Sequence, residues 1–268
     1  MKLKEMCLLG ISAAVLAACG GGGGSSPDVS ATDTVKKNPE PALTKVAGVA
    51  VTGTATYLTP LSSIPIKTEG GRIEINREGS INVLEVDGKK ITLIPQGVRS
   101  GGFHREETNT TTKAVGANLE YARYGWYSAP LTDKSYRAYL FYQGHITPEA
   151  NIPVSGTARY EGLALVSAVD RLTRNGDFFL KQGSSSFDVD FGAKTVKGDI
   201  RLSDSKYSRI PLQGNISQSG NQFGAITNEM RLEGIFLGPQ ANEMAGAFSY
   251  NPDLRTSLIG TFGAKQKQ

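Results

Sequence analysis

A short unit recurs in the second half of this 268-residue chain: apolar residue, any residue, glycine, any residue, apolar residue. Because side chains alternate between the two faces of a β-strand, the three marked positions of each unit share one face. A glycine in the middle of such a face indicates a sharp bend, or space that a neighbour's bulky side chain fills. The five copies are Val196–Ile200, Leu212–Ile216, Leu232–Phe236, Met244–Phe248 and Leu258–Phe262.

These units and their neighbours predict eight strands from residue 155 onward. Eight antiparallel strands close into a barrel that side chains can just fill. The inward Phe, Leu and Met residues therefore predict a filled core and no ligand cavity. The outward positions are charged or polar, which argues against a barrel that spans a membrane. The expected strands are 155–166, 185–191, 194–202, 209–217, 220–227, 229–237, 243–250 and 256–263.

The segment from about residue 46 to the barrel also predicts β-structure, in a less regular pattern. Asp87-Gly88 separates two apolar runs, and this dipeptide favours a two-residue hairpin turn. Further strands are expected at 72–76, 119–127 and 136–143, with a loop at 128–134. No window shows the period near 3.6 of an amphipathic helix. The chain is therefore expected to be all-β.

The N-terminus predicts export. Lys2 and Lys4 precede an apolar run, Met6–Val15, and Leu16–Cys19 reads Leu-Ala-Ala-Cys. A basic start, a short apolar stretch and small residues before a cut form a secretory signal, here residues 1–18. The run is shorter than the roughly 20 residues of a membrane-spanning helix.

Leu-Ala-Ala-Cys resembles the lipobox of bacterial lipoproteins, which implies that the thiol of Cys19 carries the lipid. The alternative is a plain signal peptide with an incidental cysteine. Gly20 stands where such lipoproteins carry Asp for inner-membrane retention, so the resemblance favours the outer membrane. Residues 19–45 are rich in Gly, Ser and Pro, which predicts a flexible tether between the lipid and the folded part.

Cysteine and charge content exclude several classes of protein. The other cysteine, Cys7, lies in the signal segment, so the mature chain has no disulfide framework, structural zinc site or cysteine nucleophile. Loss of residues 1–18 leaves 27 basic and 24 acidic residues. A net charge of +3 is too small to indicate nucleic-acid binding.

Four segments carry a resemblance to a known family. Gly234–Gly246 and the ending Gly260–Lys265 resemble the barrel signature of transferrin-binding protein B, and the factor H-binding proteins end similarly. Pro153–Gly162 resembles the first barrel strand of that family, and Leu84–Leu93 a hairpin of its factor H-binding branch. The resemblance implies an irregular β "handle" domain at 46–152 and an eight-stranded antiparallel barrel domain with a filled core at 153–268.

The same resemblance implies a function. It implies a lipid-anchored outer-membrane protein that faces the cell exterior, is exported by an outer-membrane translocator, and binds a host-derived ligand. Known relatives capture transferrin, factor H or haem, or serve host colonisation. Only one handle–barrel unit is expected here, whereas transferrin-binding protein B has two, so direct capture of transferrin is not expected.

The residues give little support for catalysis. Asp188 and Asp190 alternate on one strand, as solvated acids do, and Ser184–Ser186 lacks the Gly-x-Ser-x-Gly pattern of a hydrolase. No metal-binding motif is present. We therefore expect a protein that is not an enzyme and holds no metal.

Two classes of ligand stay open, besides a role in adhesion. Haem requires an axial ligand in an apolar slot, and the candidates are His104, in an expected loop, and His145. A host protein would be bound by exposed aromatic and Arg anchors. The candidate anchors are Arg123, Tyr124, Trp126 and Tyr127, although burial in the handle explains Trp126 equally well.

Overall fold

The computed structural model describes residues 43–56, 66–67, 71–98, 100–108, 111–132, 135–170, 180–203 and 206–267. The predicted signal segment, Cys19 and the tether as far as residue 42 lie outside these ranges. Across them the chain folds as seventeen strands and one 3₁₀ turn, η1 (Glu149–Asn151). None of the described helical segments is long and apolar enough to cross a bilayer. The all-β prediction is confirmed.

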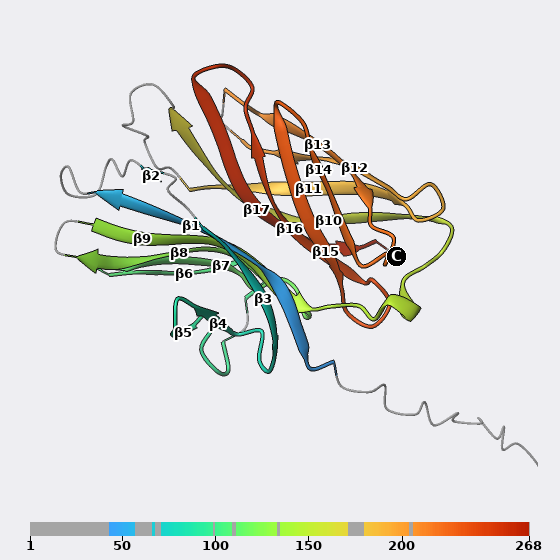
Figure 1. Cartoon of the computed structure of the whole chain (residues 1–268), viewed down its shortest axis with the longest axis horizontal. Helices are drawn as coiled ribbons and strands as arrows, with labels where there is room; N and C mark the ends of the chain where they lie inside the picture. Colours follow the sequence, from blue (N-terminus) through green and yellow to red (C-terminus); the bar gives the residue numbers. More distant parts are fainter. Residues whose placement is uncertain are drawn as a thin grey trace, which may run out of the picture. The chain divides into compact units, whose positions relative to one another are not determined.

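The first half forms a seven-stranded antiparallel sheet (Figure 1). Its strands run in the order β2-β1-β9-β8-β7-β6, and β3 pairs with β1 beside β2. The strands are β1 (Lys45–Thr56), β2 (Ile66–Lys67), β3 (Arg72–Glu78), β6 (Phe103–Glu107), β7 (Thr112–Gly116), β8 (Ala122–Thr132) and β9 (Ser135–His145).

A two-stranded hairpin, β4 (Val83–Val86) and β5 (Lys89–Thr92), packs on one face of this sheet. Its turn is the predicted Asp87-Gly88, with φ of 48° and 71°. Two positive φ angles define the type I′ turn that matches the twist of paired strands. The predicted hairpin is therefore confirmed.

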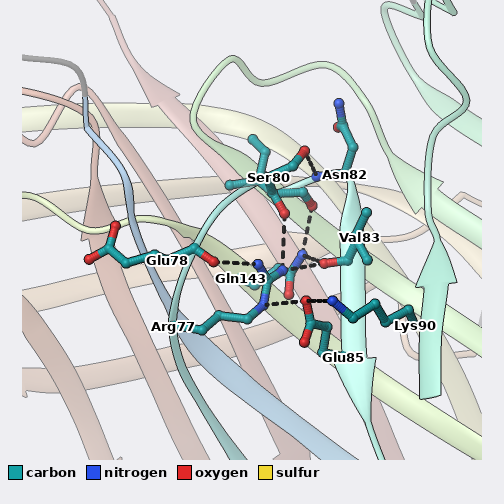
Figure 2. Close-up of polar contacts among 9 residues, drawn as sticks. Arg77, Glu78, Ser80, Asn82, Val83, Glu85, Lys90 and Gln143 are labelled. Carbon is teal, nitrogen blue, oxygen red and sulfur yellow. Dashed lines mark hydrogen bonds and ion pairs between the residues drawn. The ribbon is translucent and has the colours of Figure 1, made fainter. Parts of the chain in front are cut away.

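Polar contacts fix the start of this hairpin to the sheet, as Figure 2 shows. Gln143 Nε2 donates to the carbonyls of Ile81 and Val83 at 2.6 and 2.9 Å. The Arg77 guanidinium donates to Val83 O and, at 3.0 Å, to Ser80 O. Because Arg77 and Gln143 come from β3 and β9, the hairpin is held by two strands distant in sequence.

The second half is a closed barrel in which each strand pairs with the next and β17 pairs back to β10. All eight predicted strands are present. They are β10 (Thr157–Asp170), β11 (Lys181–Asp190), β12 (Thr195–Arg201), β13 (Arg209–Ile216), β14 (Gln222–Ile226), β15 (Met230–Leu237), β16 (Glu243–Tyr250) and β17 (Thr256–Gln266).

Phenylalanine rings fill the barrel, and the repeated glycines give them room. A Cβ on Gly234 would lie 2.2 Å from the Phe223 ring, and one on Gly260 would lie 2.6 Å from the Phe248 ring. Real Cβ atoms do not approach so closely, so each glycine is required by a neighbouring strand's ring. The predicted filled core is confirmed, with side chains such as Phe187, Phe236 and Phe262 fully buried.

Two local predictions were wrong. Residues 128–132 are not a loop, because β8 continues to Thr132 and pairs with β9 as far as Ser135, with a register shift between Pro130 and Thr132. Pro130 has no N–H to donate, and its nitrogen faces away from β9. It also lies beyond the last pair of β8 with β7, Thr112↔Ser128, so no hydrogen bond is lost there. His104 lies in β6 rather than in a loop.

The expected boundary at 152/153 falls in the connection between β9 and β10. The described residues, from 43 to 267, belong to one compact unit. The division into a handle domain and a barrel domain therefore stays a prediction.

Candidate functional site

The four predicted anchor residues lie on two opposite faces of β8. Tyr124 and Trp126 point toward the barrel, where they pack with residues of β10, β15, β16 and β17. Arg123 and Tyr127 point toward the β4–β5 hairpin. The split follows directly from the two-residue period of a strand.

Tyr124 is a packing residue between sheet and barrel, with no exposed surface. Its ring lies between two glycines, Gly116 of β7 and Gly263 of β17, where a Cβ would come within 2.3 Å of the ring at either position. Its hydroxyl donates to Asn118 Oδ1 at 2.7 Å. Burial raises the pKa of the phenol far above its ordinary value. The prediction that Tyr124 is an exposed anchor is therefore wrong.

Arg123 and Tyr127 also make contacts inside the handle. Arg123 Nε donates to Asn82 Oδ1 at 2.8 Å, and Nη1 donates to Leu119 O at 2.7 Å. Burial lowers the pKa of this guanidinium. The Tyr127 ring stacks on Tyr139 at a centroid distance of 6.1 Å. Both side chains thus contribute to the packing between β8 and the β4–β5 hairpin.

Trp126 differs from the other three, because it lines an apolar groove between the seven-stranded sheet and the barrel. The groove has a volume of about 250 Å³. Leu140 of β9 and Val51 of β1 lie on the sheet side, and Ala247 and Ile259 lie on the barrel side. Val51 is 37% exposed, so the groove opens to solvent, whereas Trp126 at 5% lies deep within it.

An ion-pair cluster lies at the rim of this groove. Arg72 Nη1 is 2.6 Å from Glu74 Oε1, and Arg72 Nε is 3.2 Å from Glu233 Oε2 on the barrel. The hydrogen bond to Glu74 raises the pKa of Arg72. Arg231 lies 3.9 Å from Glu233. Arg72, Arg231 and Glu233 line the groove, and Glu74 pairs with Arg72 beside it, so each charged side chain at the rim has an ion-pair partner.

A buried carboxylate fixes the two walls of the groove relative to each other. Glu243 of β16 accepts hydrogen bonds from the backbone N–H groups of Glu120 and Tyr121, both at 2.8 Å. Burial raises the pKa of Glu243, which the two hydrogen bonds oppose. Nothing in the sequence distinguishes this acid from a solvated one, because its partners are more than 120 residues away.

The chain between β9 and β10 docks on the barrel next to Glu243. Gly238 N–H donates to His145 O at 2.9 Å, and Thr147 Oγ1 donates to Gly238 O at 2.7 Å. An isolated bridge joins Ile146 to Leu237. The connection is thus part of the contact between sheet and barrel.

The structure does not bring the two histidines together. His104 is on β6 and His145 on β9, with β7 and β8 between them, so three inter-strand spacings of about 4.8 Å separate the strands. His104 Nε2 lies 2.8 Å from Glu106 Oε1. His145 Nδ1 is buried without a hydrogen-bond partner among the described residues, and burial lowers its pKa.

Neither histidine lines the apolar groove. Within the described ranges, no three His, Cys, Asp or Glu side chains are placed to hold a metal ion. Among the described residues, this groove therefore has no histidine that could serve as an axial haem ligand.

Comparison with known proteins identifies the barrel. Residues 152–266 match the family model described as the C-lobe and N-lobe β-barrels of transferrin-binding protein B. Transferrin-binding protein B of Haemophilus influenzae is 27% identical over 212 residues, which cover 66% of this chain and 34% of that protein. An uncharacterized protein of the same organism is 28% identical over 209 residues, covering 73% of this chain and 69% of that protein.

A third relative is the neisserial heparin binding antigen of Neisseria meningitidis. It is 29% identical over 191 residues, which cover 70% of this chain and 34% of the antigen. The chain therefore spans about a third of the length of the named relatives that it matches.

Solved structures of transferrin-binding protein B share the fold. The protein from Haemophilus parasuis superposes with a TM-score of 0.56 at 24% identity, over 82% of this chain and 46% of that one. The protein from Neisseria meningitidis gives 0.55 at 23% identity, over 82% and 44%. Residues 152–266 thus match the barrel of the transferrin-binding protein B family, and the chain is similar to members of that family in sequence and in fold.

Proposed function

We propose that this chain is a non-catalytic, lipid-anchored protein of the outer-membrane surface that captures a host protein. The lipid on Cys19 holds it to the bilayer, and a translocator of the outer membrane exports it. The apolar groove around Trp126 receives an aromatic or aliphatic side chain of the host protein. This groove is the single observation that carries the proposal.

Three properties of the groove support a side chain as its occupant. Its lining is mainly apolar, the charged side chains at its rim are ion-paired, and its walls are held by buried contacts such as those of Glu243 and Tyr124. Hot spots of protein interfaces are aromatic or apolar anchors that fill desolvated pockets. A volume of about 250 Å³ lies below the roughly 300–1,000 Å³ of sites that enclose whole drug-sized ligands. Haem is larger than such a side chain, and the groove offers it no histidine.

Membrane attachment is tested with Cys19→Ala. The wild-type chain is expected to incorporate labelled palmitate, to fractionate with the outer membrane and to bind antibody on intact cells. The variant is expected to lose the label and to leave the membrane fraction. Equal labelling of the two chains would contradict the proposed anchor.

Ligand capture is tested with a charge placed in the groove. Val51→Asp is compared with Val98→Asp, which is similarly exposed at 40% against 37% but lies outside the groove. The probes are host transferrin, because the relatives are named for binding it, whole host serum and haemin. We expect a serum protein to bind wild type and Val98→Asp alike, and Val51→Asp at least tenfold more weakly, about 1.4 kcal/mol.

Two results would contradict this function. Retention of the serum protein by Val51→Asp would exclude the groove as its site. A saturable Soret band with haemin, lost in His104→Ala or His145→Ala, would favour haem capture instead.

A further inference from the structure

Among the described strands of the barrel, β13 has an unpaired edge along most of its length. β13 pairs with β12 from Arg209 to Asn215, but with β14 only at Asn215↔Gly224 and Ile216↔Phe223. A Cβ on Gly214 would lie 2.9 Å from the Gly224 backbone, so the two strands are tightly apposed there and diverge beyond it. The opposite side of the opening, Ile226 of β14, is 76% exposed.

The hydrogen-bond register determines which backbone groups face this opening. Leu202 N–H donates to Ser208 O, and Ile216 N–H donates to Lys194 O. The backbone N–H and C=O groups of even-numbered residues of β13 therefore bond to β12, and those of odd-numbered residues point toward the opening. The free edge presents the N–H and C=O of Arg209 and Gln213 and the C=O of Pro211, which has no N–H.

A polar groove of about 850 Å³ runs beside this edge. It is lined by residues of β10 to β13, by the β14–β15 turn and by Tyr250 of β16. The groove and the free edge thus border the same opening, and an extended chain that paired with β13 would lie within it.

The groove as a whole is lined by four basic and four acidic side chains, but beside β13 itself three basic side chains adjoin one acid, Asp199. Asp199 accepts from Arg201 Nε at 2.8 Å and from Arg209 Nε at 3.2 Å, and it is largely buried by them. The arginine side chains are 65% and 64% exposed, so their other N–H groups face solvent. Lys197 lines the same groove. Arginine forks bind carboxylates through paired hydrogen bonds, so an acidic side chain fits here.

We propose that β13 is a docking edge for an extended, acidic segment of a partner protein, which adds a strand to the barrel. Strand addition derives affinity from main-chain hydrogen bonds and specificity from alternate side chains. The segment would bond to Arg209, Pro211 and Gln213 and place a carboxylate against Arg201 and Arg209. This site lies on a different part of the barrel from the apolar groove and does not depend on it.

A second copy of this chain is a poorer occupant of the same edge. In an antiparallel pair centred on Pro211, two prolines would face each other with no donor between them. The arginines of both copies would also adjoin, and like charges directly opposite are destabilising. An acidic partner strand avoids both costs.

The test begins with the free full chain. Amide hydrogen exchange measured by NMR should be fast at Arg209 and Gln213 and slow at Leu212, whose N–H faces β12. Protection of Gln213 in the free chain would overturn the proposal. If that protection disappeared on deletion of residues 20–42, the chain's own N-terminal segment would be the occupant instead.

The second step uses decapeptides selected from a random phage-displayed library against the full chain. The proposal requires that selected peptides are acidic, slow the exchange of Gln213 and bind at least tenfold more weakly to Arg209→Glu. Gln213→Pro, which removes the edge donor, should abolish binding, whereas Gln213→Ala should not. Selected peptides can also be N-methylated at every second amide, in either of the two alternating sets. Methylation of the set that faces β13 should abolish binding and methylation of the other set should not, which tests strand pairing without altering the protein's fold. Selected peptides that are insensitive to both changes, or a failure to select any, would overturn the proposal.

Discussion

Gly263→Ala tests how the sheet and the barrel are held together. The Tyr124 ring lies between Gly263 and Gly116, and a Cβ on Gly263 would be 2.3 Å from its Cε1. Carbon atoms in contact prefer about 3.5–4.0 Å, so the ring would have to move by about 1 Å. The backbone at Gly116 lies on the other side of the ring, so such a movement would separate the sheet from the barrel.

The expected cost follows from two opposing effects. Overpacking of a filled core costs about 1–3 kcal/mol. Replacement of glycine by alanine within a strand recovers about 0.5–1 kcal/mol of conformational entropy. We therefore expect the free energy of unfolding to fall by about 1–2 kcal/mol, since the overpacking cost is the larger. For a chain of this size that lowers Tm by about 2–8 °C.

Urea unfolding followed by tryptophan fluorescence measures this cost. Trp126 is the single tryptophan of the chain and lines the groove between sheet and barrel, so its emission reports on their packing. Gly101→Ala is the matched control, because a Cβ there would meet no atom within 4 Å. In a Tyr124→Leu background the cost of Gly263→Ala should fall by about 1 kcal/mol or more, as expected for residues in contact.

Two results would refute this reasoning. Gly263→Ala would lower the free energy of unfolding no more than Gly101→Ala does. Alternatively, its cost would be the same with Leu as with Tyr at position 124, which would mean that the ring is not the obstacle.

Three further predictions concern single side chains. Because burial raises the folded-state pKa of Glu243 above 4.5, its contribution to stability is present below about pH 4.5 and is lost as pH rises through the folded value. Glu243→Gln should flatten this dependence in pH-dependent unfolding, and should cost about 1–3 kcal/mol because one buried N–H loses its acceptor. Hydrogen bonds from Tyr207 and Thr256 lower the pKa of Asp253 from 3.8 to about 2. Its contribution is therefore present above pH 3.8 and lost as pH falls toward 2, and Asp253→Asn should remove acid sensitivity in that window. Gly88→Ala places a side chain at a φ of 71° and should lower the free energy of unfolding, measured by thermal unfolding, by about 1–2 kcal/mol.

The barrel could be predicted because its information is local. Each glycine-centred unit indicates which residues share one face of a strand. The five units and their neighbours together predict the strands that form the closed barrel. The structure adds the partner of each glycine, such as Phe223 over Gly234. The Asp87-Gly88 turn is local in the same sense, because the turn type demands residues that tolerate positive φ.

The site could not be predicted because its contacts are distant in sequence. Alternation in β8 separates Tyr124 and Trp126 from Arg123 and Tyr127, but it does not say which face meets the barrel. The aromatic cluster therefore read as an exposed anchor. Glu243 reaches Glu120 across 123 positions, and that pairing depends on how the barrel docks rather than on any pattern around either residue.

An aromatic ring packs against a glycine both inside the barrel and between the barrel and the sheet. The second of these contacts connects stability to the proposed function. Inside the barrel Phe223 packs against Gly234, and at the contact with the sheet Tyr124 packs against Gly263. The second contact fixes the spacing of the groove walls, and a preorganised pocket binds more tightly because less ordering is required on binding. Gly263→Ala should therefore weaken capture of the host protein at temperatures where the variant stays fully folded. Unchanged binding by a folded Gly263→Ala chain whose Trp126 emission has shifted would show that the ligand does not use this groove.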